Sequence, residues 1–72
     1  MTRYKVTFYN ENSYEEGINY YISDDIHSAG ESVSFDLQRK AFILMSANDD
    51  SQGFCYVRAA LIASFFIEED KE

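Results

Sequence analysis

The sequence predicts a mainly β fold, a small antiparallel sheet or partly closed barrel, which becomes α+β if one short helix is added. The first observation is an alternation of apolar and polar residues that recurs along the chain, with β-branched and aromatic residues at the apolar positions. The second is that the three glycines are spread over three polar segments that separate the alternating ones. At 72 residues the chain suits one compact domain, which we place at 1–68, followed by a short acidic tail at 69–72.

The first half of the chain is expected to hold three strands. Their alternating segments are Arg3–Tyr9, Ile18–Ile22 and Val33–Leu37. A polar loop at 10–17, which ends in a glycine, joins the first two strands. A loop or one helical turn at Asp24–Gly30 joins the second and third.

The second half is expected to form a hairpin and a last strand. The continuous apolar run Ala41–Met45 is typical of a central strand covered on both faces. A turn at Asn48–Gly53 and a return strand at Phe54–Val57 complete an antiparallel hairpin. The segment 58–67 fits a helix by its alanine content and a strand by its alternation. Three acidic residues follow it, which disfavours a helix end there, so we prefer a strand with a short turn near Ala59.

The composition argues against direct binding to nucleic acid or membranes. Thirteen acidic residues against six Lys and Arg give a net charge of −7, whereas a protein that grips phosphates needs clustered cations. The chain has no apolar run of about 18 residues, and its first residues are too polar for a signal peptide. The single cysteine excludes an internal disulfide, so we expect a protein of the reducing cytoplasm.

The sequence indicates no enzyme chemistry, so no catalytic residue, metal or cofactor is expected. His27 and Cys55 are the only residues of their kinds, too few for a structural zinc site. Cys55 stands between Phe54 and Tyr56, which predicts a buried packing residue and not a nucleophile with His27 as its base. The segment that begins at Asn48 does not match a calcium-binding loop, because Ala59 occupies the twelfth position, where a carboxylate is required.

The acidic residues are concentrated in two stretches of the chain. Residues 6–38 contain seven carboxylates and no Lys or Arg, and residues 68–72 add a second cluster. One interpretation is a solvated surface that keeps a small domain soluble. The other is a rigid imitation of the DNA phosphate track, which attracts the cations of a DNA-binding protein. The candidate partner-binding carboxylates are Glu11, Glu15, Glu16, Asp24, Asp25, Glu31, Asp36, Glu68, Glu69 and Asp70.

The chain resembles small acidic bacteriophage proteins that disable host machinery. The resemblance lies in its size, its acidic block from Glu11 to Asp36 and its acidic last residues, 67–72. Among these proteins it resembles the phage-encoded DNA-mimic inhibitor of the bacterial histone-like nucleoid protein HU. The resemblance implies a non-enzymatic dimer whose acidic surface occupies the DNA-binding site of HU. Five basic residues depart from a pure polyanion, namely Arg3, Lys5, Arg39, Lys40 and Arg58. Two alternatives stay open: an inhibitor of another host protein, such as RNA polymerase or a nuclease, and a structural or assembly subunit.

Twelve aromatic residues in 72 exceed what so small a core encloses. The expected aromatic core consists of Tyr4, Phe8, Tyr20, Phe35, Phe42 and Phe65. The tyrosines expected at the surface are Tyr9, Tyr14 and Tyr21. Exposed aromatic patches commonly mark interfaces, so we expect a homodimer.

Overall fold

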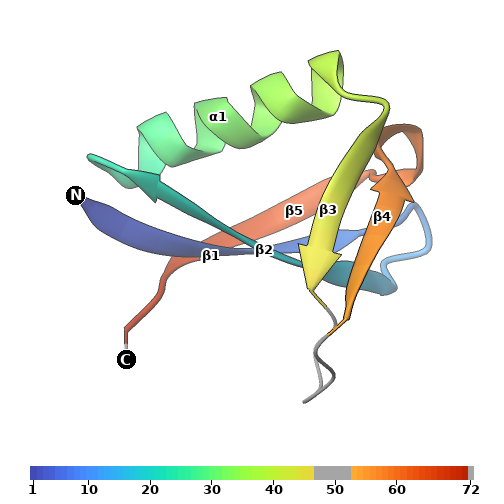
Figure 1. Ribbon diagram of the computed structural model, residues 1–72, viewed down its shortest axis with the longest axis horizontal. Coiled ribbons are helices and arrows are strands. Elements are labelled where there is room, and N and C mark those ends of the chain that lie inside the picture. Colours follow the sequence, from blue (N-terminus) through green and yellow to red (C-terminus); the bar gives the residue numbers. More distant parts are fainter. Residues whose placement is uncertain (47–52, 72) are drawn as a thin grey trace.

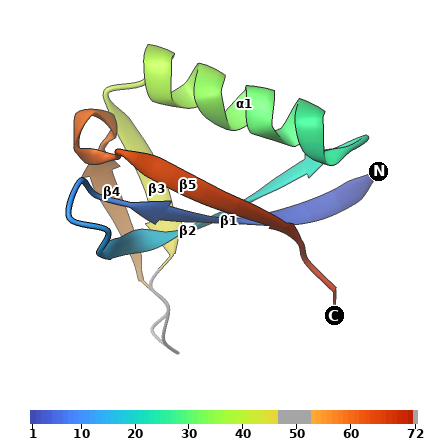
Figure 2. The same ribbon diagram turned by 180° about the vertical axis from the view of Figure 1, so that it is seen from behind.

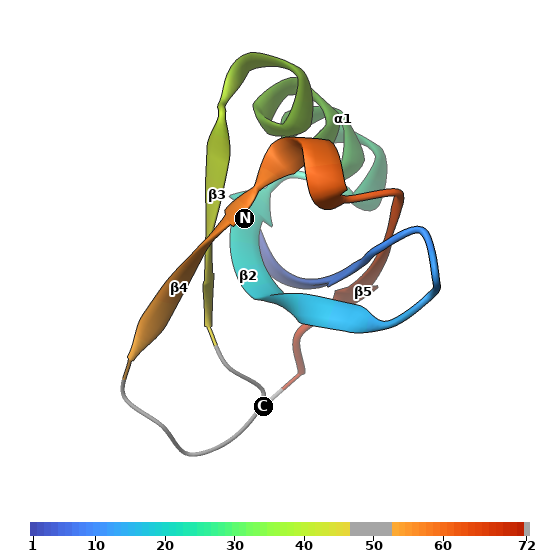
Figure 3. The same cartoon turned by 90° about the vertical axis from the view of Figure 1, so that its right-hand side faces the viewer.

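The computed structural model describes residues 1–46 and 53–71, and it has one antiparallel sheet with one α-helix packed on it (Figure 1). The elements are β1 (Thr2–Tyr9), β2 (Glu15–Ser23), α1 (Ile26–Arg39), β3 (Phe42–Ser46), β4 (Phe54–Arg58), the 3₁₀ turn η1 (Ala59–Leu61) and β5 (Ser64–Glu69). The sheet has five strands in the order β4-β3-β2-β1-β5, and every neighbouring pair is antiparallel. Figure 3 shows the sheet curving beneath α1, with β3 and β4 on one side and β5 on the other. The predicted mainly β fold with one helix is confirmed.

The β1–β2 hairpin confirms the first two predicted strands, but the loop predicted at 10–17 is too long, because β2 already begins at Glu15. Local hydrogen bonds close the turn. The side-chain oxygen of Asn10 accepts from the backbone N–H groups of Asn12 and Tyr14. Gly17 has a φ of 156°, and a Cβ built there would lie 2.8 Å from Cβ of Met45. Only glycine lets β3 pack this closely on β2 without strain.

The third predicted strand, Val33–Leu37, is wrong, because these residues belong to α1. The Asp25 carboxylate caps the helix by accepting from the backbone N–H of Ser28 at 2.7 Å. Ala29 and Val33 are buried and Leu37 is half-buried, which is the i, i+4 spacing of a helix stripe. Within 33–37 alone, this stripe cannot be distinguished from the alternation of a strand. The cap at Asp25, eight residues before Val33, indicates the helix.

Ala41–Met45 is not the central strand that its apolar run predicts. The strand runs from Phe42 to Ser46 as β3, next to the edge strand β4, and only one of its faces is covered. Ile43 and Met45 are buried, whereas Phe42 and Leu44 are exposed. The reason is that α1 covers one face of the sheet.

The remaining predictions for the second half are confirmed where the structure describes them. β3 and β4 pair antiparallel from Phe42–Arg58 to Ser46–Phe54, as a hairpin requires. The turn predicted at Asn48–Gly53 lies outside the described residues, except for Gly53. The segment 58–67 is a short 3₁₀ turn followed by a strand, and not a helix.

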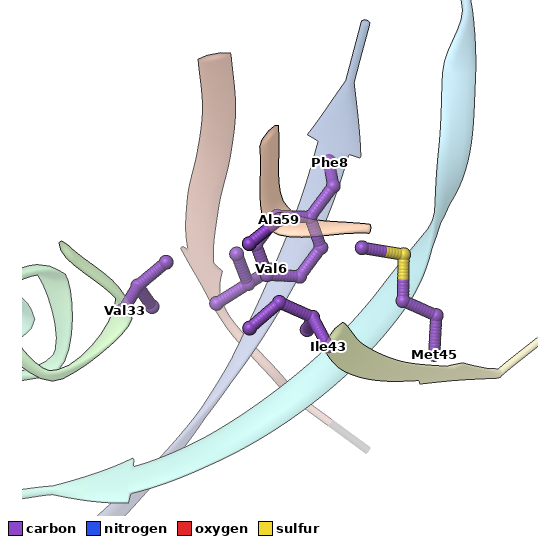
Figure 4. Close-up of a cluster of buried hydrophobic side chains, with 6 residues drawn as sticks. All are labelled: Val6, Phe8, Val33, Ile43, Met45 and Ala59. Atoms are coloured by element: carbon purple, nitrogen blue, oxygen red, sulfur yellow. The ribbon is translucent and has the colours of Figure 1, made fainter. Parts of the chain in front are cut away.

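The core lies between α1 and the sheet and contains fewer aromatic rings than expected. Its buried cluster is Val6, Phe8, Val33, Ile43, Met45 and Ala59 (Figure 4). Of the predicted aromatic core, Tyr4 and Phe8 are buried and Phe65 packs against the cluster. Tyr20, Phe35 and Phe42 are exposed, at 37%, 56% and 46%. This prediction was wrong for those three rings. Tyr20 and Phe42 lie on the face of the sheet that α1 does not cover, and Phe35 lies on α1 outside its buried stripe of Ala29 and Val33.

At the C-terminal end, β5 extends further than the domain boundary placed at residue 68. Glu69, expected in the tail, is the last residue of β5 and the register partner of Tyr4. The backbone N–H of Asp70 donates to the carbonyl oxygen of Arg3 at 2.9 Å. Within residues 1–46 and 53–71, no helix is long and apolar enough to cross a membrane.

Candidate functional site

The candidate carboxylates lie at opposite ends of the sheet and along α1, and not on one continuous track. Thr2 pairs with Ser23 and Tyr4 pairs with Glu69, so the ends of β2 and β5 flank the start of β1. We call the carboxylates there the acidic end (Asp24, Asp25, Glu68, Glu69 and Asp70) and those of the β1–β2 hairpin the acidic turn (Glu11, Glu15 and Glu16). The eight residues of β1 separate the two groups by about 25 Å at the rise of a strand. The continuous acidic stretch of the sequence is therefore divided in space.

Four of the ten carboxylates hold the fold together. Asp25 caps α1, and the bond from the Ser28 N–H lowers the pKa of its carboxyl group. Asp36 accepts a hydrogen bond from the Tyr21 hydroxyl at 2.8 Å and lies 3.5 Å from Nζ of Lys40. The other two contacts are Asp70 with the Arg3 guanidinium at 3.4 Å, and Glu16 with the side-chain amide of Asn10 at 3.2 Å.

The other six carboxylates are exposed and have no side-chain hydrogen bond or ion pair within the described parts of the chain. They are Glu11, Glu15, Asp24, Glu31, Glu68 and Glu69. Glu31 lies on α1, six residues after the cap, or about 9 Å along the helix axis. Asp24, Glu68 and Glu69 therefore lie at the end of the sheet where α1 begins, and Glu31 lies farther along α1, across the groove from β5. The other two lie in the acidic turn.

The sheet face opposite α1, which we call the open face, carries large apolar side chains. Register partners place one row on it that crosses all five strands: Phe66, Thr7, Ile18, Ser46 and Phe54. Every second residue along a strand shares a face. The exposed large apolar residues of the open face are Tyr20, Ile22, Phe42, Leu44, Phe54, Tyr56 and Phe66.

Sequence reasoning missed most of these residues because it placed the apolar runs 41–45 and 54–57 in the interior. Only alternate residues of each run face the helix. Three basic side chains also belong to the open face. Lys5 is the register partner of Tyr20 and of Glu68. The other two stack on rings: the Arg3 guanidinium is 4.1 Å from the ring centre of Tyr20, and that of Arg58 is 5.2 Å from Phe42. Three of the five basic residues that depart from a polyanion therefore lie among the aromatic residues.

The arrangement does not bring His27 and Cys55 together. His27 is in the first turn of α1, beside β5, whereas Cys55 is on β4, the opposite edge of the sheet. Cys55 is exposed, so the prediction that it is buried was wrong. Its side chain faces the helix side, as its partner Met45 does, but no helix reaches this edge strand.

Among the tyrosines expected at the surface, Tyr21 departs most from the expectation. It is half-buried and its hydroxyl is hydrogen-bonded, whereas Tyr9 is partly covered and Tyr14 is exposed at 70%.

No group of three or more His, Cys, Asp or Glu suited to a metal ion occurs among the described residues. Comparison with protein-family models, with curated proteins and with solved structures finds no match to this chain.

Proposed function

We propose that this protein is a non-enzymatic DNA mimic that binds the DNA-binding surface of a basic host protein of the HU type and blocks its binding to DNA in the cytoplasm. The observation that carries the proposal is the group Asp24, Glu31, Glu68 and Glu69, exposed and without an ion pair in the described residues. The resemblance to small acidic phage inhibitors supports the choice of partner.

Three carboxylates of this group stand on secondary structure, and Asp24 lies in the two-residue link between β2 and α1. Glu31 is in the middle of a capped helix, and Glu68 and Glu69 are in a hydrogen-bonded strand. Little conformational entropy is then lost when a partner binds, which leaves more of the electrostatic attraction as affinity. Carboxylates at the rim of an interface act chiefly by speeding association, so binding should weaken strongly with salt.

A homodimer through the open face is part of the proposal. Seven large apolar side chains are exposed there, at 37% to 70%, and side chains of this size present on the order of 700 Å² of surface together. A stable interface needs about 800 Å² from each partner. Pairing two open faces would cover this surface and leave Asp24, Glu31 and Glu69 outside it, with a net charge of −14 from two chains of −7. Glu68 shares the open face with Phe66 on the edge strand β5, so it would lie at the rim of the interface.

The test is competition for HU between this protein and duplex DNA, measured by gel shift at low and high salt. Two double variants carry the same charge change: Asp24→Lys with Glu31→Lys near the acidic end, and Glu11→Lys with Glu15→Lys in the acidic turn. We expect the wild type to release DNA at low salt. The first variant should compete about tenfold less well, which is about 1.4 kcal/mol, and the second should compete nearly as the wild type does.

Equal loss in both variants would show that net charge alone acts, and failure of the wild type to release DNA at low salt would exclude HU as the partner. A second candidate function, an assembly subunit, is favoured by the open face alone. It predicts self-association that is independent of the four carboxylates, and no basic partner. An inhibitor of RNA polymerase or a nuclease would instead inhibit that enzyme, with the same dependence on the acidic end.

A further inference from the structure

An open groove runs between α1 and β5, which is an edge strand of the sheet. Its volume is about 690 Å³. The strand contributes Phe65 and Ile67, and the helix contributes a polar and apolar mixture that includes Ile26, Gly30 and Phe35. Figure 2 views the molecule from this side and shows α1 above β5, with the chain turning away from α1 after β5 ends. The described C-terminal residues therefore leave the groove uncovered.

The backbone of β5 has a free edge along this groove. The N–H of Asp70 donates to the Arg3 carbonyl, and in an antiparallel pair such bonded positions recur at every second residue. The backbone groups of Glu68 and Phe66 accordingly point toward β1. Those of Phe65, Ile67 and Glu69 point away from the sheet, on the side where a further strand would pair. The three side chains of this second set share the helix-facing side of β5 with their partners on β1.

We propose that the groove binds an extended peptide segment, which pairs with the free edge of β5 as a sixth strand and places alternate apolar side chains beneath α1. Backbone bonds to the edge would supply affinity, and the spaces under the helix would select side chains. This inference does not depend on HU being the partner.

The charges around the groove select a basic segment. Glu31 lines it from the helix, and Glu69 extends the row formed by Phe65 and Ile67 on the strand. Glu68 faces the opposite side of the same strand. In an added strand whose apolar residues lie beneath α1, the alternating Lys or Arg residues lie on the other face, beside Glu68, while Glu31 and Glu69 add to the negative potential around the groove. A second copy of β5 would instead bring its own glutamates to the edge. The occupant is therefore a partner segment with alternating apolar and basic residues.

Gly30 offers a way to close the groove without disturbing the fold. It lines the groove from the helix, and a Cβ built on it meets no atom within 4 Å. A leucine there would extend into the groove, and replacing glycine in a helix favours folding. Ser32 is an exposed residue of the same helix that does not line the groove, so Ser32→Leu is the matched control.

The probe is a fluorescein-labelled, amidated peptide of sequence Lys-Val-Lys-Val-Lys-Val-Lys, with binding measured by fluorescence polarisation and by amide chemical shifts of the protein. We expect the shifts to centre on Phe65, Ile67 and Glu69. Gly30→Leu should weaken binding by about tenfold or more, and Ser32→Leu should leave it unchanged. Glu69→Pro, which removes one outward N–H, should weaken binding more than Glu69→Gln, which removes only the charge.

A second peptide separates strand pairing from charge. It has the same sequence with backbone N-methyl groups on alternate residues. Its charge and side chains are kept, but the backbone N–H groups along one edge of the peptide can no longer donate hydrogen bonds. We expect weaker binding by about tenfold for the methylation pattern that blocks the edge facing β5. Equal binding of all methylated forms, or equal binding by Gly30→Leu, would mean nonspecific attraction of a cationic peptide and would overturn the proposal. If the wild type binds no peptide and Gly30→Leu loses self-association, the free edge of β5 pairs with a second copy of the chain instead, and the proposal is wrong.

Discussion

The hydroxyl of Tyr21 donates a 2.8 Å hydrogen bond to Oδ2 of Asp36, which ties β2 to the second half of α1. Asp36 also lies 3.5 Å from the ammonium group of Lys40, one turn later in the sequence. A residue from the acidic stretch thus serves as an anchor for the helix. The pKa of the Tyr21 hydroxyl is raised well above its ordinary value of 10.0. Burial of the hydroxyl is the larger cause, and its hydrogen bond to the Asp36 carboxylate is the second.

Tyr21→Phe should lower the free energy of unfolding by about 1–2 kcal/mol, because the bond to a charged acceptor is lost. A group whose pKa is higher in the folded state contributes stability below its unfolded pKa and loses it as pH rises further. Wild-type stability should therefore fall above pH 10.0, the ordinary tyrosine value, more steeply than that of Tyr21→Phe. Urea unfolding at pH 7 and at higher pH measures both effects. Tyr20→Phe is the control, because Tyr20 is exposed and its ring keeps the contact with Arg3.

Asp25→Ala should lower the melting temperature, whereas Asp24→Ala should change it little, because only Asp25 accepts the bond from Ser28. The pKa of Asp25 is lower in the folded protein, so the stability it contributes is present above the ordinary value of 3.8 and is lost as pH falls through the folded value. Asp25→Asn keeps a capping side chain and should remove this part of the acid dependence. Thermal unfolding by circular dichroism between pH 2 and 7 tests it, and identical acid profiles for wild type and Asp25→Asn would refute it.

Gly17→Ala and Gly30→Ala should change stability in opposite directions. At Gly17 a Cβ would lie 2.8 Å from that of Met45 and the backbone has a φ of 156°, so alanine should destabilise the protein by about 2 kcal/mol or more. At Gly30 nothing lies within 4 Å, so alanine should stabilise the helix by about 0.5–1 kcal/mol. Chemical denaturation of the two variants beside the wild type gives both values.

Cys55 should react with a thiol reagent in the native protein, because its side chain is exposed on β4. Cys55→Ser should change stability by no more than about 0.5 kcal/mol, as other surface substitutions do. Partner binding should also stay intact. A thiol that reacts only after unfolding would contradict this placement.

Tyr56→Glu should shift a homodimer toward monomer at micromolar concentration, because it places a charge on the apolar open face, beside its register partner Leu44. Tyr14→Glu is a matched control, since both tyrosines are 70% exposed but Tyr14 lies in the β1–β2 hairpin. Sedimentation velocity of the three proteins measures the change. A monomeric wild type would remove the dimer from the proposed function and leave the open face without a second copy.

The amino-acid sequence by itself was enough to predict the strands whose pattern is local. Tyr4, Val6 and Phe8 alternate with polar residues, and their period of two holds whatever lies around them. The turn and strand of the last segment were also predictable, because acidic residues at 68–70 are unfavourable at a helix end. Between Val33 and Leu37, however, a short apolar repeat suits either structure, and the contact of Asp25 with Ser28 selected the helix.

Only the tertiary structure decided which apolar residues are covered and which carboxylates meet. A single helix covers one face of the sheet, so Ile43 is buried while its neighbours Phe42 and Leu44 remain exposed. Burial depends on what packs above a residue, and sequence periodicity does not specify that. In the same way, Glu31 and Ile67 are 36 positions apart in the sequence, yet they line one groove because α1 packs beside β5. Glu15 and Asp24, nine positions apart, lie at opposite ends of β2 because an extended strand separates its ends by its full length.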